Sequence, residues 1–75
     1  MNSYRVDRAR EVLSPPCGMN SILYVGDDYE EALRVFLESE GGKDAWGRRD
    51  PAYGVMLSMW SPNRNDYITK RWKNK

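Results

Sequence analysis

The sequence predicts a small α+β domain in which a single antiparallel sheet, with elements in the order β-β-α-β-β, carries one helix packed on one face. Two patterns support this fold class: one amphipathic helix between residues 27 and 42, and two alternating segments between residues 53 and 72. The length fits a single domain, residues 1–75, and a chain this short buries only about 60% of the surface that its unfolded form exposes.

The predicted helix is defined by the spacing of its apolar residues. They recur at i, i+3, i+4, i+7 and i+8 and form one stripe that must be buried: Tyr29, Ala32, Leu33, Phe36 and Leu37. We expect Asp27, or alternatively Asp28, to cap the first turn by accepting hydrogen bonds from its free backbone amides. Gly41-Gly42 is expected to end the helix in the left-handed conformation that glycine adopts readily.

Two strands are expected before the helix. Residues 4–13 fit both a strand and a helix, because Tyr4 and Val6 share strand parity whereas Val6, Ala9 and Leu13 share a helix face. We favour a strand, since alternation with charged residues suits a half-exposed strand and a second helix would leave few strands for a sheet. Adjacent prolines end this segment, and residues 20–25, rich in β-branched and aromatic side chains, form a strand that runs into the helix.

The segment after the helix predicts a β-hairpin. Residues 53–60 are the most apolar part of the chain and form a central strand, residues 61–66 are a polar turn cluster, and residues 67–72 resume alternation. Strict alternation gives Tyr67 and Trp72 opposite parity, so they are expected on different sheet faces. Residues 73–75 are expected to fray.

The helix is expected to cover only one of the two faces of the predicted sheet. The helix stripe should meet one set of apolar residues: Val55, Leu57, Met59, Ile68, and Leu23 or Ile22. The opposite face, with no cover, should hold some members of a mixed set: Tyr24, Met56, Trp60, Thr69 and Arg71. A face with a Trp, a Tyr and a Met is more apolar than a solvated surface needs to be, so a second copy of the chain or another protein is expected to cover it.

The residue inventory excludes most catalytic chemistry. The sequence contains no His and one Cys, which excludes a closed zinc site and the usual general base. No phosphate-binding loop, dinucleotide fingerprint or nucleophile motif is present, so no catalytic residue, metal ligand, cofactor or small-molecule substrate is predicted, and the chain is not expected to be an enzyme. The single Cys17 cannot form an internal disulfide, which favours a reducing cytoplasm. No run of residues approaches a membrane span.

Charge divides the chain into two halves. Residues 1–42 hold four Arg and eight acids, a net charge of −4, whereas residues 43–75 hold eight Lys or Arg and three acids, a net charge of +5. In a compact fold the two halves can neutralise each other. The acids of the helix, among them Glu31 and Glu38, can instead offer a surface that imitates nucleic acid to a basic partner.

These patterns lead to two main functional hypotheses. The first is a non-catalytic protein-binding module, with a homodimer as one form, anchored by aromatic and Met side chains: Tyr24, Trp46, Met56 and Trp60. The alternative is nucleic-acid binding through bases interleaved with aromatic residues in the second half: Arg48, Arg49, Lys70, Arg71 and Trp72. The salt dependence of binding distinguishes the two hypotheses, because charge-driven binding to nucleic acid weakens steeply as ionic strength rises.

In size, aromatic content and lack of catalytic motifs, the composition resembles that of small accessory proteins carried by bacteriophages and other mobile elements. Some of those proteins act by occupying the surface of a host enzyme or defence complex. The resemblance covers composition alone, and it implies no binding residue.

Overall fold

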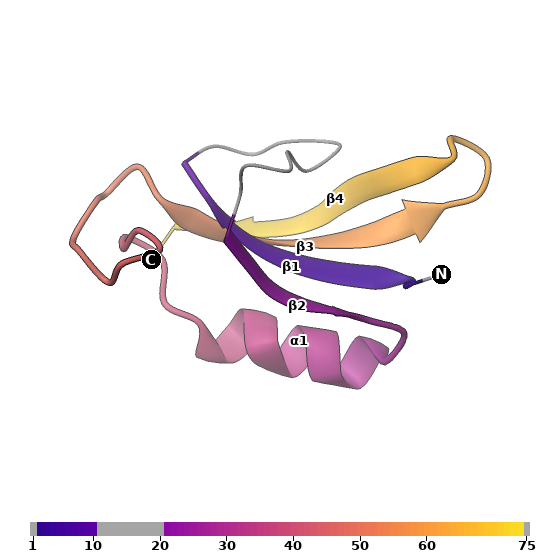
Figure 1. Ribbon diagram of the computed structural model, residues 1–75, viewed down its shortest axis with the longest axis horizontal. Coiled ribbons are helices and arrows are strands. Elements are labelled where there is room, and N and C mark those ends of the chain that lie inside the picture. Colours follow the sequence, from indigo (N-terminus) through magenta and orange to yellow (C-terminus); the bar gives the residue numbers. More distant parts are fainter. Residues whose placement is uncertain (1, 11–20, 75) are drawn as a thin grey trace.

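The computed structural model describes residues 2–10 and 21–74 of the chain (Figure 1). These residues form a four-stranded antiparallel sheet with one helix, which confirms the predicted β-β-α-β-β order and α+β class. The elements along the chain are β1 (Tyr4–Ala9), β2 (Ser21–Gly26), α1 (Tyr29–Glu38), β3 (Gly54–Ser61) and β4 (Asp66–Lys73). Within the ambiguous first segment, Tyr4–Ala9 form a strand, whereas its residues 11–13 and the predicted turn containing Cys17 lie outside the described residues.

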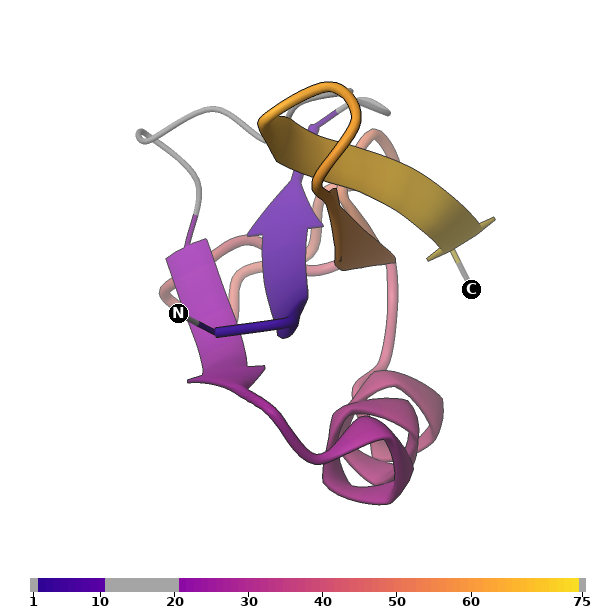
Figure 2. The ribbon, with the colours of Figure 1, turned by 90° about the vertical axis from the view of Figure 1, so that its right-hand side faces the viewer.

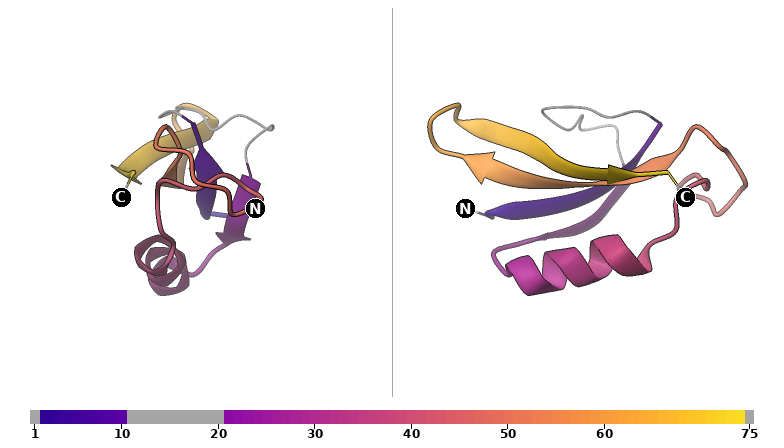
Figure 3. Two further views of the ribbon diagram at one scale, coloured as in Figure 1. Left: turned by 90° about the vertical axis from the view of Figure 1, so that its left-hand side faces the viewer. Right: turned by 180° about the vertical axis from the view of Figure 1, so that it is seen from behind.

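The strands lie in the order β2-β1-β3-β4, so β1 and β3 are central and β2 and β4 form the two edges. The helix contacts β1, β2 and β3 and covers one face of the sheet (Figure 2). The turn between β3 and β4 and the loop between α1 and β3 lie at opposite ends of the sheet (Figure 3). The hairpin and the central position of β3 are as predicted, although Lys73 belongs to β4 rather than to a fraying tail.

The core fills the space between the helix and the central strands. Its buried members are Val6, Ala32, Phe36, Val55 and Leu57, and Tyr4, Tyr24 and Val35 pack against them from the side. Val6 lies opposite Leu57 in β3 and opposite Tyr24 in β2, so these three side chains share the face toward the helix. Burying a large apolar side chain contributes about 1.5–3 kcal/mol, so this small cluster provides much of the stability.

The helix buries a narrower set of residues than its apolar stripe predicts. Ala32 and Phe36 are buried, whereas the Leu37 side chain is 61% exposed and Leu33 is only partly covered. The prediction that the whole stripe is buried was therefore wrong. One helix lying on one sheet contacts it over a limited arc, and residues at the flank of a wide stripe stay in solvent.

Both ends of the helix differ from the prediction, which had Asp27 as the first choice of N-cap and Gly41-Gly42 as the C-terminal end. Asp28 is the N-cap, and its Oδ1 accepts from the Glu31 amide at 3.2 Å, whereas Asp27 accepts from the Ser3 amide at 2.8 Å and so ties the N-terminal segment to the helix. The helix ends at Glu38 with Ser39 in extended conformation, before the two glycines. Gly42, with φ of 76°, turns the following loop instead.

A β-bulge in β4 changes which side chains share a face. Leu57 lies opposite Arg71 but Ser58 lies opposite Thr69, which leaves Lys70 as the extra residue. Because the extra residue reverses the parity, Tyr67 and Trp72 lie on the same face, opposite Trp60 and Met56 respectively. The expectation that Tyr67 and Trp72 occupy different faces was wrong for this reason.

The face away from the helix is not the open surface that the sequence predicts. At its centre Met56, Ser58 and Asp7 are fully buried. Trp60 packs edge-on against Tyr67 with ring centroids 5.3 Å apart, and both rings are half-buried. Tyr24 and Arg71 were expected on this face, but they lie opposite Val6 and Leu57 and therefore belong to the helix side.

Asp7 is a buried carboxylate in this face. The Arg5 Nε donates to both of its oxygens, at 2.8 and 2.9 Å. Burial raises the pKa of Asp7 above its usual 3.8, and the hydrogen bond and charge of Arg5 only partly offset this effect. Between the unfolded and the folded pKa of Asp7 the native state therefore binds more protons than the unfolded state, and stability falls as pH rises through that interval.

We therefore predict a pH-dependent difference between the wild-type protein and Asp7→Asn. The contribution of Asp7 to the free energy of unfolding is largest below pH 3.8, decreases as pH rises through the folded pKa, and is constant above it. Urea unfolding of both proteins between pH 3 and 7 measures this contribution as the wild-type value minus the variant value. A difference that grows with pH over the same interval would contradict the assignment.

Candidate protein-interaction site

The loop between α1 and β3 contains a tightly bonded turn at residues 43–49. The Asp44 amide donates to the Arg48 carbonyl at 2.9 Å, the Gly47 amide donates to the Asp44 carbonyl at 3.1 Å, and Lys43 and Arg49 form a β-bridge. Gly47 has φ of 81°, a conformation that side-chain-bearing residues rarely adopt. The turn thus has a fixed backbone path.

The Asp44 carboxylate holds this turn together from inside. Its Oδ1 accepts from the Trp46 and Arg48 amides, both at 2.9 Å, and its Oδ2 accepts from Arg48 Nε at 3.0 Å. Burial by itself raises the pKa of Asp44, but the two amides and the Arg48 guanidinium outweigh it, so the pKa lies below its usual value. The carboxylate is therefore ionised at neutral pH and keeps its three hydrogen bonds.

Trp46 projects from this turn into solvent. Its exposed fraction is 79%, the highest of any large hydrophobic residue in the described part of the chain. Arg48 beside it is held by Asp44, whereas Arg49 is exposed and has no ion pair among the described residues. The turn therefore presents an exposed indole ring and an exposed guanidinium from a fixed backbone.

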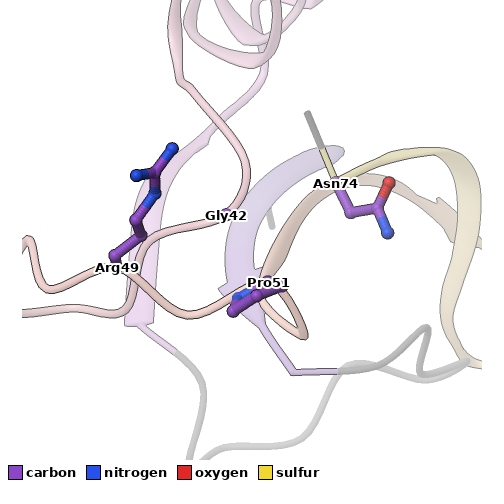
Figure 4. A pocket seen from close by; sticks show the side chains of 4 residues that line it. All are labelled: Gly42, Arg49, Pro51 and Asn74. Atoms are coloured by element: carbon purple, nitrogen blue, oxygen red, sulfur yellow. The ribbon is translucent and has the colours of Figure 1, made fainter.

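A pocket of about 380 Å³ lies at the base of the turn. It is lined by Gly42, Arg49, Pro51 and Asn74, with Arg49 and Asn74 on opposite sides (Figure 4). Two backbone hydrogen bonds fix its floor, from the Gly42 amide to the Tyr53 carbonyl at 2.8 Å and from the Asp50 amide to the Gly42 carbonyl at 2.9 Å. Arg49 belongs to both the pocket and the turn, so the two features form one surface.

The four residues predicted to anchor a protein partner do not form one surface. Tyr24 packs beside the core, and its hydroxyl lies 3.3 Å from the Asp28 amide and 3.4 Å from the Asp28 carbonyl oxygen at the start of the helix. Met56 is fully buried, so in this conformation it cannot contact a partner. Trp60 is half-buried against Tyr67, which leaves Trp46 as the most accessible of the four.

The residues predicted to bind nucleic acid are likewise spread over different surfaces. Arg48 and Arg49 lie in the turn, and Lys70 is the bulge residue of β4. Arg71 lies on the helix side of the sheet, while Trp72 lies on the opposite side and is half-buried against the backbone of Gly54. The structure therefore does not bring these bases and Trp72 together on one platform.

The acidic surface of the helix is largely paired. Arg34 bonds both Glu31 and Glu38, and Lys43 lies 3.0 Å from Glu40. The guanidinium of Arg34 is thus shared between two carboxylates, and Arg34 and Lys43 offset part of the negative charge of this face. This pairing weakens the case for nucleic-acid mimicry.

Sequence reasoning did not identify two features of these surfaces. Asp44 was treated as part of a connection, although an Asp followed three residues later by Gly is the residue preference of a common β-turn. A second hollow, of about 400 Å³, lies on the helix and is lined by Glu30, Leu33, Arg34, Leu37 and Glu38. It was missed because Leu33 and Leu37 were assigned to the core.

The surface features above are the basis for any functional assignment. No family model, curated protein or solved structure matches this chain. Among the described residues, no group of three or more Cys, Asp or Glu side chains is placed to hold a metal ion. The single helix of the described residues, α1, lacks the length and hydropathy that a membrane crossing requires.

Proposed function

We propose that this protein is a non-catalytic protein-binding module whose principal contact is Trp46. The observation that carries the proposal is the presentation of a 79% exposed indole on a turn fixed by the Asp44 carboxylate. Leaving such a large apolar side chain in water brings no folding energy, whereas an internal carboxylate is used to hold its backbone. A recognition role accounts for both features.

Physical principles of binding favour this use of Trp46. Tryptophan is enriched among the residues that dominate interface energies, because it buries a large area and offers one N–H donor. A fixed backbone lowers the entropy lost on binding, so more of the contact energy remains as affinity. Arg49, exposed and without an ion pair among the described residues, adds a charge that can orient the partner. The module would work in a reducing cytoplasm by occupying a partner's surface, as some phage-type accessory proteins do.

The experiment compares the wild-type protein with Trp46→Ala as immobilised baits. Proteins retained by the wild type and lost by the variant are purified and titrated against both by calorimetry. We expect Trp46→Ala to weaken binding by about 2 kcal/mol or more, roughly thirtyfold in Kd. Its circular dichroism and thermal unfolding should match those of the wild type, because the side chain makes little contact with the fold.

Leu37→Ala is the matched control, since it removes another large exposed apolar side chain from a different surface. It should leave the Kd unchanged. Equal affinity of wild-type protein and Trp46→Ala for the purified partner would contradict the proposal. Fluorescence anisotropy with a labelled single-stranded oligonucleotide at two salt concentrations tests the alternative. Tight binding at low salt that is lost at high salt would favour nucleic acid.

A further inference from the structure

The two edges of the described sheet differ in their protection against pairing with another strand. An edge strand offers unpaired backbone N–H and C=O groups, and soluble proteins commonly guard such edges with charged side chains. The β4 edge carries Lys70, Arg71 and Lys73. The β2 edge, with the sequence Ser-Ile-Leu-Tyr-Val-Gly, carries no charge and no proline. Figure 2 shows these two strands at opposite margins of the sheet.

Three large aliphatic side chains of β2 are exposed. Ile22 is 51% exposed, Val25 40% and Leu23 36%. A bulge at Leu23 separates the pair Val6–Tyr24 from the pair Asp7–Ile22. Because of that extra residue, Ile22 and Val25 lie on the same face of the sheet, the one away from the helix, although they are three positions apart. An aliphatic pair therefore flanks the open edge on one face.

We propose that β2 pairs antiparallel with β2 of a second copy of this chain, so that the two sheets join into one across a twofold axis. Full overlap of the strand with itself places Ser21 opposite Gly26 and Ile22 opposite Val25. Both members of the second pair lie on the same face, so the exposed aliphatic side chains meet across the new boundary.

Charge favours β2 over β4 for this contact. Full overlap of β4 with itself would pair Asp66 with Lys73 but gather Lys70 and Arg71 of both copies at the centre of the contact, whereas β2 brings together only uncharged residues. A twofold contact requires a surface complementary to itself, and a neutral strand in full overlap satisfies that condition. The proposed contact lies on β2 and the proposed partner site on the loop between α1 and β3, so the two proposals concern different segments of the chain.

The first test is the solution mass of the full chain by light scattering over a dilution series. We expect a mass near twice 8.8 kDa at high concentration that falls toward 8.8 kDa on dilution. Hydrogen exchange on the same series should show amides of β2 exchanging more slowly as concentration rises, with amides of β4 unchanged. A chain that stays monomeric throughout would overturn the proposal, as would protection at β4 in place of β2.

Two substitutions test the register. Ile22→Lys and Val25→Glu place charges at half-exposed positions, and the second lies opposite Arg5, which suits a carboxylate. Each variant alone should dissociate at least tenfold more readily than the wild type. An equimolar mixture should regain the dimer, because the introduced ammonium then lies opposite the introduced carboxylate.

Leu37→Lys is the control, since it charges a more exposed aliphatic residue on the helix and should leave the dimer intact. Equal loss of dimer in Leu37→Lys, or a dimer unaffected by Ile22→Lys and Val25→Glu, would overturn the β2 assignment. The exchange experiment on the wild-type chain decides the question independently of whether either variant folds.

Discussion

Phe36→Ala is expected to remove a large share of the free energy of unfolding. Phe36 is almost completely buried in a core with few other members, and it lies beneath the Lys73 ammonium, whose Nζ is 5.1 Å from the ring centroid. Truncation of a buried Phe typically costs about 3–5 kcal/mol. A chain of 75 residues has a total stability of roughly 4–11 kcal/mol, so this loss is a large share of it. Urea unfolding monitored by circular dichroism measures the change.

The adjacent Leu37 supplies the comparison. Its side chain is mostly exposed, so Leu37→Ala should change the free energy of unfolding by no more than about 0.5 kcal/mol. Similar costs at the two positions would contradict this packing and would mean that the helix is rotated about its axis, with Leu37 turned toward the sheet. Because sequence periodicity assigned both residues to the core, the pair also tests how wide the buried stripe is.

Gly54→Ala is expected to destabilise the β3–β4 hairpin by about 1–3 kcal/mol or more. A Cβ at this position would collide with the Lys73 carbonyl oxygen and with the Trp72 ring. The ring can move, but the carbonyl belongs to the paired strand and can move only if the β3–β4 pairing opens. Thermal unfolding and the amide exchange of β4 should both report the loss.

A double-mutant cycle separates the two collisions. In a Trp72→Ala background the ring is absent, so Gly54→Ala should cost less than in the wild type, while the contact with the Lys73 carbonyl keeps the cost above zero. Additive effects of the two substitutions would show that Trp72 does not cover Gly54.

The fold class followed from patterns that local physics determines strongly. The 3.6-residue spacing of Ala32 and Phe36 and the alternation around Val55 and Leu57 predicted the helix, the central strand and the face between them. Capping was less determined, because Asp27 and Asp28 are chemically equivalent. A tertiary contact decides between them, because Asp27 accepts a hydrogen bond from the Ser3 amide while Asp28 caps the helix by accepting from the Glu31 amide.

The side-chain faces of β2 and β4 could not be predicted because each strand contains one extra residue. The bulges at Leu23 and Lys70 reverse parity partway along their strands and have no distinctive composition. Strict alternation therefore placed Tyr24 on the wrong face and separated Tyr67 from Trp72. The prediction of an open face away from the helix was wrong for a second reason. Met56 is fully buried there, and its burial depends on tertiary packing, which alternation along one strand does not report.

The candidate site was predicted only in part. Trp46 was identified because an aromatic residue in a polar connection is unusual, but its exposure and fixed backbone depend on Asp44. Arg49 had been assigned to the nucleic-acid alternative, and the structure places it in the same turn. Loop geometry of this kind arises from side-chain to backbone hydrogen bonds, which residue periodicity does not report.

The decisive measurement for the proposed recognition turn is ¹⁵N relaxation of the Trp46 and Arg48 amides in the wild-type protein and in Asp44→Ala. With the turn held by Asp44, both amides should have order parameters of about 0.85 in the wild type, and these should fall below about 0.6 in the variant. Flexible amides in the wild-type protein, or order parameters unchanged by the loss of the carboxylate, would contradict the view that the fold presents Trp46 for binding.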